Sequence, residues 1–410
     1  MKSNNSLIRP SIRFEGFTDE WEQRKLYEVA DFNPKSELPD TFEYVDLESV
    51  IGTEMISHRT ETRDTAPSRA QRLAQTGDVF FQTVRPYQRN NYLFAKSDNN
   101  YVFSTGYAQM RPKIDAEFLM CFLQTDSFVK VVLDNCTGTS YPAINSNDLS
   151  NLEIALPVLE DEQRKIGSFI TNIDNLITLH QRKCDEIKGL KKYMLQKMFP
   201  KKGERVPEIR FEGFTDDWEQ RKLEDLFEII DTKHATAPIS DEKTEYKMIR
   251  TNCVRDGLLL AENTDSVTEK VYEEWSERIH LRVGDLVFTR EAPMGESAVI
   301  TEDGNKYFPG QRIVSMRSKG NASTFFINQL FYADEFRKEI KIREAASTTV
   351  ANFGIPQIKN HIVSVPCLEE QVKIGEFFSC LGNLITLQQR KCDEMKEVKK
   401  YMLQNMFQGK

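Results

Sequence analysis

An internal repeat is the feature that most constrains how this chain can fold. Residues 12–26 recur as residues 209–223 with a single change, Glu20 to Asp217. Residues 157–199 recur as residues 366–407, whereas the segments between the matched parts differ strongly. Each copy of a repeat is one structural unit that packs on its neighbour. The sequence therefore predicts two similar frames with pseudo-two-fold symmetry, and each frame carries a different insert.

The second repeated segment predicts one long helix in each copy. Pro157 and Pro366 precede it, and acidic residues fill its first turn, where the helix dipole favours them. Its apolar residues recur at alternating spacings of four and three, which is the heptad pattern of a coiled coil. We expect two helices, each ~60 Å long, that pack antiparallel on each other. The seam positions are Ile166, Ile170, Ile173, Ile177, His180, Cys184, Ile187, Lys191, Met194 and Met198, with Ile374, Phe378, Leu381, Ile385, Gln388, Cys392, Met395, Lys399, Met402 and Met406 in the second copy.

The first repeated segment contains Phe14, Phe17 and Trp21 around Gly16. We expect these aromatic residues to anchor the start of each insert to its frame. The exposed-looking charges after Trp21 allow a partner-binding role as the alternative. Outside the heptad seam, Phe169, Leu176 and Leu179 leave further apolar surface, for which a partner protein is one explanation.

Length and composition limit the class of protein. At 410 residues the chain is long enough for two or three domains. Hydrophobic residues make up 39% of it, so sizeable cores are expected and global disorder is excluded. No run of ~18 apolar residues occurs, and the amino terminus lacks the apolar segment of a signal peptide. These features predict a cytoplasmic protein that does not contact a membrane.

Charge and the metal-binding residue types exclude further classes. The seven cysteines and five histidines are scattered, without the spacing of a disulfide framework or a metal site. The net charge of −8 argues against a protein that coats nucleic acid through bulk charge. It leaves open a protein that recognises nucleic acid through local basic patches.

The inserts mix strand-like and helical patterns, which indicates an α/β (mixed α+β) fold. Residues 44–47, 78–81, 285–288 and 360–365 have the composition of strands. Residues 116–133 and 325–342 have the pattern of helices. Short echoes between the inserts suggest a shared framework, namely Gly77-Asp78 against Gly284-Asp285 and Met110-Arg111 against Met316-Arg317.

Loops in each insert carry residue types that suit contact with DNA. A loop that follows a strand offers arginine, amide and aromatic side chains, and such groups can read base edges. A second group of arginines and a group of hydroxyl residues suit phosphates. The bland alternative is a solvated turn. The candidates are Arg59, Arg63, Arg69, Arg72, Thr83, Arg85, Tyr87, Gln88, Arg89, Asn90, Thr139, Ser140 and Tyr141 in the first insert and Arg290, Glu291, Met294, Arg312, Thr348 and Thr349 in the second, where Arg290 is taken as the equivalent of Arg85.

The motifs of common enzymes are missing. The sequence has no phosphate-binding loop, no adjacent prolines as in the amino-methyltransferase motif, and no nucleophile-elbow or zinc-protease motif. Two Glu-x-Lys tripeptides, Glu245 with Lys247 and Glu339 with Lys341, have the spacing of some nucleases. Such tripeptides are common on charged surfaces, so we predict a protein that is not a catalyst.

The arrangement resembles the specificity (S) subunit of type I restriction–modification systems. The resemblance covers nearly the whole chain and rests on the order insert, helix, insert, helix. It also rests on the paired segments that open the helices, residues 159–166 and 368–374, and on the loops 138–140 and 347–349 shortly before them.

The resemblance implies target-recognition domains over residues 1–158 and 201–367, with spacer helices over 159–200 and 368–410. Each domain would read one half of a bipartite site in double-stranded DNA. Two methyltransferase subunits that bind S-adenosylmethionine, and two motor-nuclease subunits that use ATP and Mg²⁺, would join this chain, which itself would hold no cofactor. The alternatives are an interaction scaffold that binds no DNA and a nuclease that uses Glu245 and Lys247 or Glu339 and Lys341.

Overall fold

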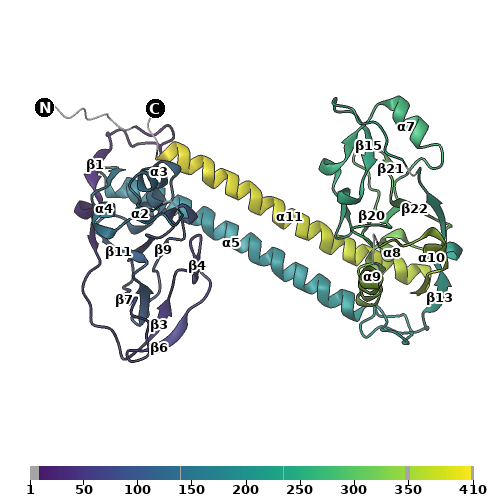
Figure 1. Cartoon of the computed structure of the whole chain (residues 1–410), viewed down its shortest axis with the longest axis horizontal. Helices are drawn as coiled ribbons and strands as arrows, with labels where there is room; N and C mark the ends of the chain where they lie inside the picture. Colours follow the sequence, from purple (N-terminus) through teal and green to yellow (C-terminus); the bar gives the residue numbers. More distant parts are fainter. Residues whose placement is uncertain (1–8, 139, 234, 347–350, 408–410) are drawn as a thin grey trace. The chain divides into compact units, whose positions relative to one another are not determined.

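The computed structural model describes residues 9–138, 140–233, 235–346 and 351–407. It divides into two compact units (Figure 1). The first unit combines Met1–Gln181 with Gln389–Lys410, and the second is Arg182–Gln388. Each unit therefore holds one insert together with part of both long helices. This mixed α/β architecture, with two inserts and two long helices that pack together, confirms the predicted fold class.

The described part of the first unit contains two four-stranded sheets and two two-stranded sheets. Their strand orders are β2-β11-β8-β9, β6-β3-β10-β7, β1-β12 and β4-β5. Strands β3 and β10 are parallel, and the other pairs are antiparallel. The elements are β1 (Glu22–Lys25), α1 (Leu26–Val29), β2 (Ala30–Phe32), β3 (Thr41–Val45), β4 (Val50–Ile51), β5 (Glu54–Met55), β6 (Arg59–Thr62), β7 (Ala70–Leu73), β8 (Val79–Gln82), η1 (Pro86–Gln88), β9 (Tyr92–Leu93), β10 (Tyr101–Ser104), β11 (Tyr107–Pro112), α2 (Ala116–Leu123), α3 (Asp126–Asp134), α4 (Ser146–Ser150), β12 (Glu153–Leu156) and the start of α5 (Glu160–Lys197).

The second unit repeats this order with small changes. Its main sheets are β14-β22-β19-β20 and β18-β15-β21, and β13 pairs with β23. The elements are β13 (Glu219–Lys222), α6 (Leu223–Leu226), β14 (Phe227–Asp231), β15 (Tyr246–Ile249), η2 (Thr251–Cys253), β16 (Val254–Arg255), β17 (Leu258–Leu259), η3 (Ala261–Asn263), β18 (Asp265–Ser266), α7 (Glu269–Trp275), β19 (Leu286–Thr289), β20 (Ser297–Val299), β21 (Lys306–Pro309), β22 (Ile313–Ser318), α8 (Thr324–Leu330), α9 (Asp334–Ala346), α10 (Ile355–Asn360), β23 (Ile362–Val365) and the start of α11 (Leu368–Met406).

The predicted helices of the inserts are each divided into two. Residues 116–133 form α2 and α3, because Thr125 interrupts the first helix and caps the second by accepting a hydrogen bond from the N–H of Phe128. Residues 325–342 are divided in the same way between α8 and α9. Of the predicted strand at 360–365, only Ile362–Val365 is a strand, because Asn360 ends α10.

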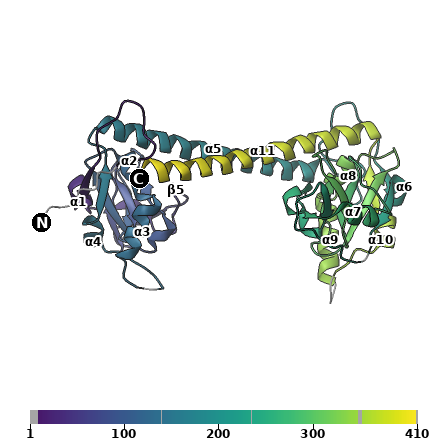
Figure 2. The ribbon, with the colours of Figure 1, turned by 90° about the horizontal axis from the view of Figure 1, so that it is seen from above.

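The two long helices pack on each other antiparallel within each unit (Figure 2). In the first unit, Cys392 Sγ lies 4.0 Å from the carbonyl oxygen of Ile177, and Lys399 pairs with Asp174 at 2.6 Å. In the second unit, Cys184 Sγ lies 3.9 Å from the carbonyl oxygen of Ile385, which is the equivalent contact. Every predicted seam residue is buried or half-buried, so the heptad pattern is confirmed.

The repeated segments join at a junction that is built twice. Arg13 makes two hydrogen bonds to Glu162, at 2.6 and 2.7 Å, and Arg210 makes two to Glu370, at 2.7 and 2.8 Å. The contact with Glu162 raises the pKa of Arg13. Close packing accompanies these pairs, because a Cβ added to Gly167 would lie 2.7 Å from the backbone nitrogen of Phe118.

Aromatic residues complete the same junction in both units. Trp21 packs edge-on against Phe118 and against Phe407, which follows the end of α11. Trp218 packs in the same way against Phe326 and against Phe199, which follows the end of α5. The anchoring role predicted for the first repeated segment is therefore seen in its contacts.

The short sequence matches between the inserts correspond to a second contact that is present in both units. Arg111 pairs with the buried Asp78 at 2.9 Å, and Arg317 pairs with the buried Asp285 at 2.6 Å. These residues hold the central sheet of each insert and belong to the shared framework. Among the described residues, no helix is both long and apolar enough to cross a membrane.

Candidate nucleic-acid interface

The loop after β8 meets the segment before α4. Arg85 has a left-handed backbone, with φ 54°, and its N–H donates to the carbonyl oxygen of Pro142 at 2.8 Å. Its guanidinium lies over the ring of Tyr141, 4.4 Å from the ring centroid. The loop around Arg85 and the segment around Tyr141, which were predicted separately from the sequence, are thus adjacent in space.

The Arg85 side chain keeps its hydrogen-bond donors available. Among the residues that the structure describes, it has no carboxylate partner. Tyr141 is 63% exposed and Tyr87 is 49% exposed, so both rings face solvent. A left-handed backbone at a non-glycine residue costs free energy, and such residues cluster at functional sites. The pair Arg85 and Tyr141 can offer a planar cation and an aromatic face to a ligand.

Other residues of this loop are used within the protein. Arg89 donates to the carbonyl oxygen of Gln124 at 3.0 Å and pairs with Asp126, which lowers the pKa of that carboxyl. Asn90 Oδ1 accepts a hydrogen bond from the N–H of Gly52 at 2.8 Å. Gln88 Oε1 accepts one from Gln82 at 2.9 Å, and the buried Thr83 hydroxyl donates to Gly106. These four side chains shape the loop.

The four arginines predicted to hold phosphates differ in their surroundings. Arg59 is neutralised by Asp46 at 2.7 Å and Glu61 at 2.8 Å. The Arg63 guanidinium donates to the carbonyl oxygen of Leu38, and the Arg69 side chain is exposed.

Arg72, on β7, is the exception among these arginines. It is half-buried, and its Nε has no hydrogen-bond partner among the described residues. Burial lowers the pKa of this guanidinium. A cation in this setting would gain from an approaching anion, because a buried charge without a partner is costly.

The second insert places its candidates differently from the first. The N–H of Arg290 donates to the carbonyl oxygen of Arg312, and the carbonyl of Arg290 accepts from Phe353. Thr83 makes the equivalent two bonds, to Gly106 and from Ile144. Arg290 is therefore the equivalent of Thr83, and the predicted match with Arg85 is wrong.

The charged candidates of the second insert form a small cluster. Glu291 lies between Arg290, at 3.9 Å, and Arg312, at 2.9 Å. The Arg312 side chain is 52% exposed, and its backbone is left-handed with φ 72°. Met294, by contrast, is 3% exposed in the core, so its side chain is not available to a ligand. Thr139, Thr348 and Thr349 lie outside the described residues, and Ser140 is exposed beside Tyr141.

The residues of the nuclease alternative have other partners. Glu245 pairs with Lys306 at 3.0 Å, and Lys247 donates to Ser266 at 2.9 Å. Glu339 pairs with Arg343 at 2.6 Å. Within the described part of the chain, no three His, Cys, Asp or Glu side chains gather so that they could hold a metal ion.

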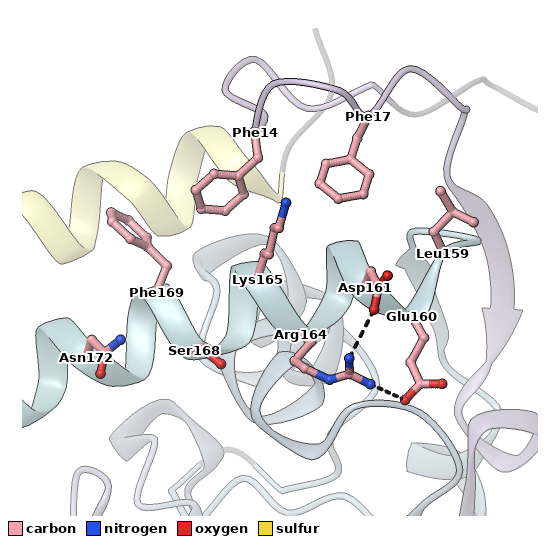
Figure 3. A pocket seen from close by; sticks show the side chains of 10 residues that line it. All are labelled: Phe14, Phe17, Leu159, Glu160, Asp161, Arg164, Lys165, Ser168, Phe169 and Asn172. Atoms are coloured by element: carbon pink, nitrogen blue, oxygen red, sulfur yellow. Dashed lines mark hydrogen bonds and ion pairs between the residues drawn. The ribbon is translucent and has the colours of Figure 1, made fainter.

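A groove of about 890 Å³ lies where the first repeated segment crosses the start of α5 (Figure 3). Phe14 packs edge-on against Phe169 with 5.7 Å between ring centroids, and Lys165 lies over Phe17 at 4.8 Å. Both contacts recur in the second unit, as Phe211 with Phe377 and Lys373 over Phe214. The remaining lining residues are Leu159, Glu160, Asp161, Arg164, Ser168 and Asn172.

Further exposed apolar residues lie on the two long helices. We call them the outer stripe: Leu176, Leu179, Leu190 and Tyr193 on α5, with Leu384, Val398 and Tyr401 on α11. All are exposed. Three pairs of positions correspond in the repeat, namely Leu176 with Leu384, Leu190 with Val398 and Tyr193 with Tyr401. Residues 176 and 190, like 179 and 193, are two heptads apart, and the charged Lys183 and Glu186 occupy the positions between them, so the outer stripe on α5 consists of two separate apolar patches.

Comparison with known proteins identifies the family. Residues 18–189 and 215–397 match the model of the type I restriction modification DNA specificity domain. The chain belongs to this family: it is the DNA specificity subunit of a type I restriction–modification system, and such subunits are non-catalytic. The predicted family, function and lack of catalytic role are confirmed.

Individual relatives agree with this assignment. The chain is 24% identical over 300 residues to the type I restriction enzyme MjaVIII specificity subunit of Methanocaldococcus jannaschii, which covers 70% of this chain and 67% of the relative. It is 24% identical over 198 residues to the putative MjaX specificity subunit of the same organism, covering 47% and 46%. The crystal structure of a type I S subunit from M. genitalium shares the fold with a TM-score of 0.63 at 14% identity, covering 98% of this chain and 99% of that one.

Proposed function

We propose that each insert reads one half of a bipartite DNA target through the loop cluster at the end of its central strand. Arg85 and Tyr141 would contact bases in the first half-site, and Arg312 beside Glu291 would do so in the second. The observation that carries this proposal is the stacking of Arg85 on Tyr141, which leaves an arginine without a carboxylate partner at a solvent-facing loop. Arginine recognises guanine through two hydrogen bonds to its major-groove edge.

Phosphate contacts would come from few side chains of this chain. Arg72 suits a phosphate because its Nε has no partner in the described structure, whereas Arg59 is already neutralised. With a net charge of −8, the isolated chain should bind DNA weakly, with a strong dependence on salt. Partner subunits would therefore supply much of the phosphate contact.

The partners would be two methyltransferase subunits and two motor-nuclease subunits, acting together with this chain in the cytoplasm. S-adenosylmethionine, ATP and Mg²⁺ would bind to those partners and not to this chain. The stoichiometry of two is supported by the repeat, because the groove contacts and the outer stripe occur once in each copy. The recognition domains would span 1–158 and 201–367, joined by spacer helices over 159–200 and 368–410, which would fix the gap between the half-sites.

Replacing Arg85 with alanine is expected to weaken recognition of the first half-site by about 1–3 kcal/mol, because a bidentate contact with one base is lost. The complex reconstituted with its methyltransferase subunits would be assayed for methylation of targets that vary at each position. Arg59→Ala is the matched control, because that guanidinium is held by Asp46 and Glu61. An Arg85→Ala complex with the base preference of the wild type would contradict the proposal.

Replacing Leu176 with glutamate is expected to remove one methyltransferase subunit from the complex. Leu176 and Leu179 form an exposed apolar patch on α5, and an apolar residue of this size contributes about 1.5–3 kcal/mol when a partner buries it. Native mass measurement would show the loss of one subunit, and Leu384→Glu should remove the other. Lys188→Glu, an exposed change outside the stripe, should retain both. Retention of both subunits by the Leu176→Glu, Leu384→Glu double variant would refute the docking surface.

A further inference from the structure

Each unit has a short hairpin at the same place in its fold. Hairpin β4–β5 follows β3 in the first unit, and β16–β17 follows β15 in the second. The turns begin at Gly52, with φ 61°, and at Asp256, with φ 50°. In these left-handed turns the backbone N–H groups point outward and need a partner outside the hairpin.

That partner is a side chain from the loop after the central strand. The N–H of Gly52 donates to Asn90 Oδ1 at 2.8 Å, and the N–H of Asp256 donates to Glu296 Oε2 at 3.0 Å. Asn90 and Glu296 are structurally equivalent, because Phe80 pairs with Tyr92 as its counterpart Val287 pairs with Ala298. An amide in one unit and a carboxylate in the other thus accept the same hydrogen bond.

The hairpin is connected in turn to α5. In the first unit, Thr178 on α5 donates its hydroxyl to Glu54 in the hairpin. In the first unit the hairpin therefore lies between the loop and α5.

A second connection holds the loop of the first unit. Arg89 pairs with Asp126, and the other carboxylate oxygen of Asp126 accepts a hydrogen bond from Gln404 on α11 at 3.3 Å. The loop that carries Arg85 is thus connected to α5 through Asn90 and to α11 through Arg89. Asn90 and Arg89 can therefore affect DNA recognition without contacting DNA.

We propose that Asn90 is a positioning residue: through the hairpin β4–β5 it fixes the DNA-reading loop of the first unit against α5 and so sets the gap between half-sites that the complex accepts, while Glu296 makes the equivalent contact with the hairpin of the second unit. The proposal rests on the proposed function, in which these loops read DNA. It assigns to Asn90 a different role from the base contact predicted from the sequence.

The test uses the complete complex with its methyltransferase subunits. Once the wild-type target is known from methylation, duplexes are compared in which the gap is lengthened or shortened by one base pair, or in which single half-site bases are changed. Asn90→Ala is expected to reduce discrimination against the altered gaps about threefold to tenfold, the effect of losing one hydrogen bond. Base preference within each half-site should stay that of the wild type.

Conservative and remote variants separate positioning from other roles. Asn90→Asp keeps the acceptor oxygen and should restore discrimination. Thr178→Val removes the hydroxyl on α5, away from the reading loop, and should relax the gap in the same direction as Asn90→Ala. A changed base preference in Asn90→Ala with unaltered gap discrimination would show a direct DNA contact and overturn the proposal. Unaltered behaviour in both respects would also overturn it.

The two proposals fail in different ways in this experiment. Base preference in the Arg85→Ala complex tests whether the loop reads DNA. Gap discrimination in the Asn90→Ala complex tests whether the loop is held in place. A loop that reads DNA without this connection would give the first effect and not the second.

Discussion

Replacing Arg13 with alanine is expected to lower the free energy of unfolding of the first unit by about 3–5 kcal/mol, because removal of one partner leaves a buried charge uncompensated. The Glu162 side chain is 1% exposed and receives two hydrogen bonds from Arg13. Among the described residues, the remaining side-chain partner of Glu162 would be Trp21 Nε1, at a longer 3.4 Å. Urea unfolding of the full-length chain, followed by fluorescence, would measure the change.

Three comparisons test whether the effect depends on the burial of the ion pair. Arg210→Ala should cost as much, because Glu370 is fully buried in the equivalent pair. Arg9→Ala should cost no more than about 1 kcal/mol, since its pair with Glu20 is exposed. Replacing both partners, as Arg13→Met with Glu162→Leu, should recover most of the loss. Equal effects of Arg13→Ala and Arg9→Ala would show that the buried pair does not hold the junction.

The repeat made most of the framework predictable from the sequence. A matched segment must do the same work in both copies, so the long helices, their heptad seam and the aromatic anchors could be inferred without a structure. The short sequence matches between the inserts were informative for the same reason, since Asp78 with Arg111 and Asp285 with Arg317 form equivalent ion pairs with a buried aspartate. Residues that recur in both copies proved to be framework residues.

The loops proposed to read DNA could not be predicted to the same depth. Arg85 and Arg89 are four residues apart in one loop, yet one is stacked on Tyr141 while the other is paired with Asp126. That difference depends on α3 and on the segment before α4, which lie far along the chain. The position of a side chain in such a loop is set by long-range contacts, and no local pattern reports them.

The predicted equivalence of Arg290 and Arg85 was wrong for a related reason. Both residues are arginines that follow a strand, but the backbone hydrogen bonds make Arg290 the equivalent of Thr83. Asn90 and Glu296 are equivalent in structure and have no similarity in sequence. The two inserts thus keep the backbone contacts of their shared framework while the side chains change.

Replacing Phe407 with alanine is expected to destabilise the first unit by about 3–5 kcal/mol, the range for truncating a buried phenylalanine. Phe407 is 4% exposed and packs on Trp21, Phe118 and Phe122, all of which belong to the first insert and its frame. The core of a domain near the amino terminus is therefore completed by the other end of the chain. Urea unfolding should show the loss, with exposure of Trp21 to solvent as its fluorescence signal.

The control lies on the same helix. Tyr401→Ala changes an exposed aromatic residue and should alter the free energy of unfolding by no more than about 0.5 kcal/mol in the isolated chain. Phe199→Ala should destabilise the second unit as Phe407→Ala does the first, because Phe199 packs on Trp218, Phe326 and Phe378 in the same way. A Phe407→Ala chain as stable as Tyr401→Ala would mean that the first insert folds without the end of α11. A loss of the expected size would show that the first recognition domain needs the end of α11 for its stability, just as the second needs the end of α5.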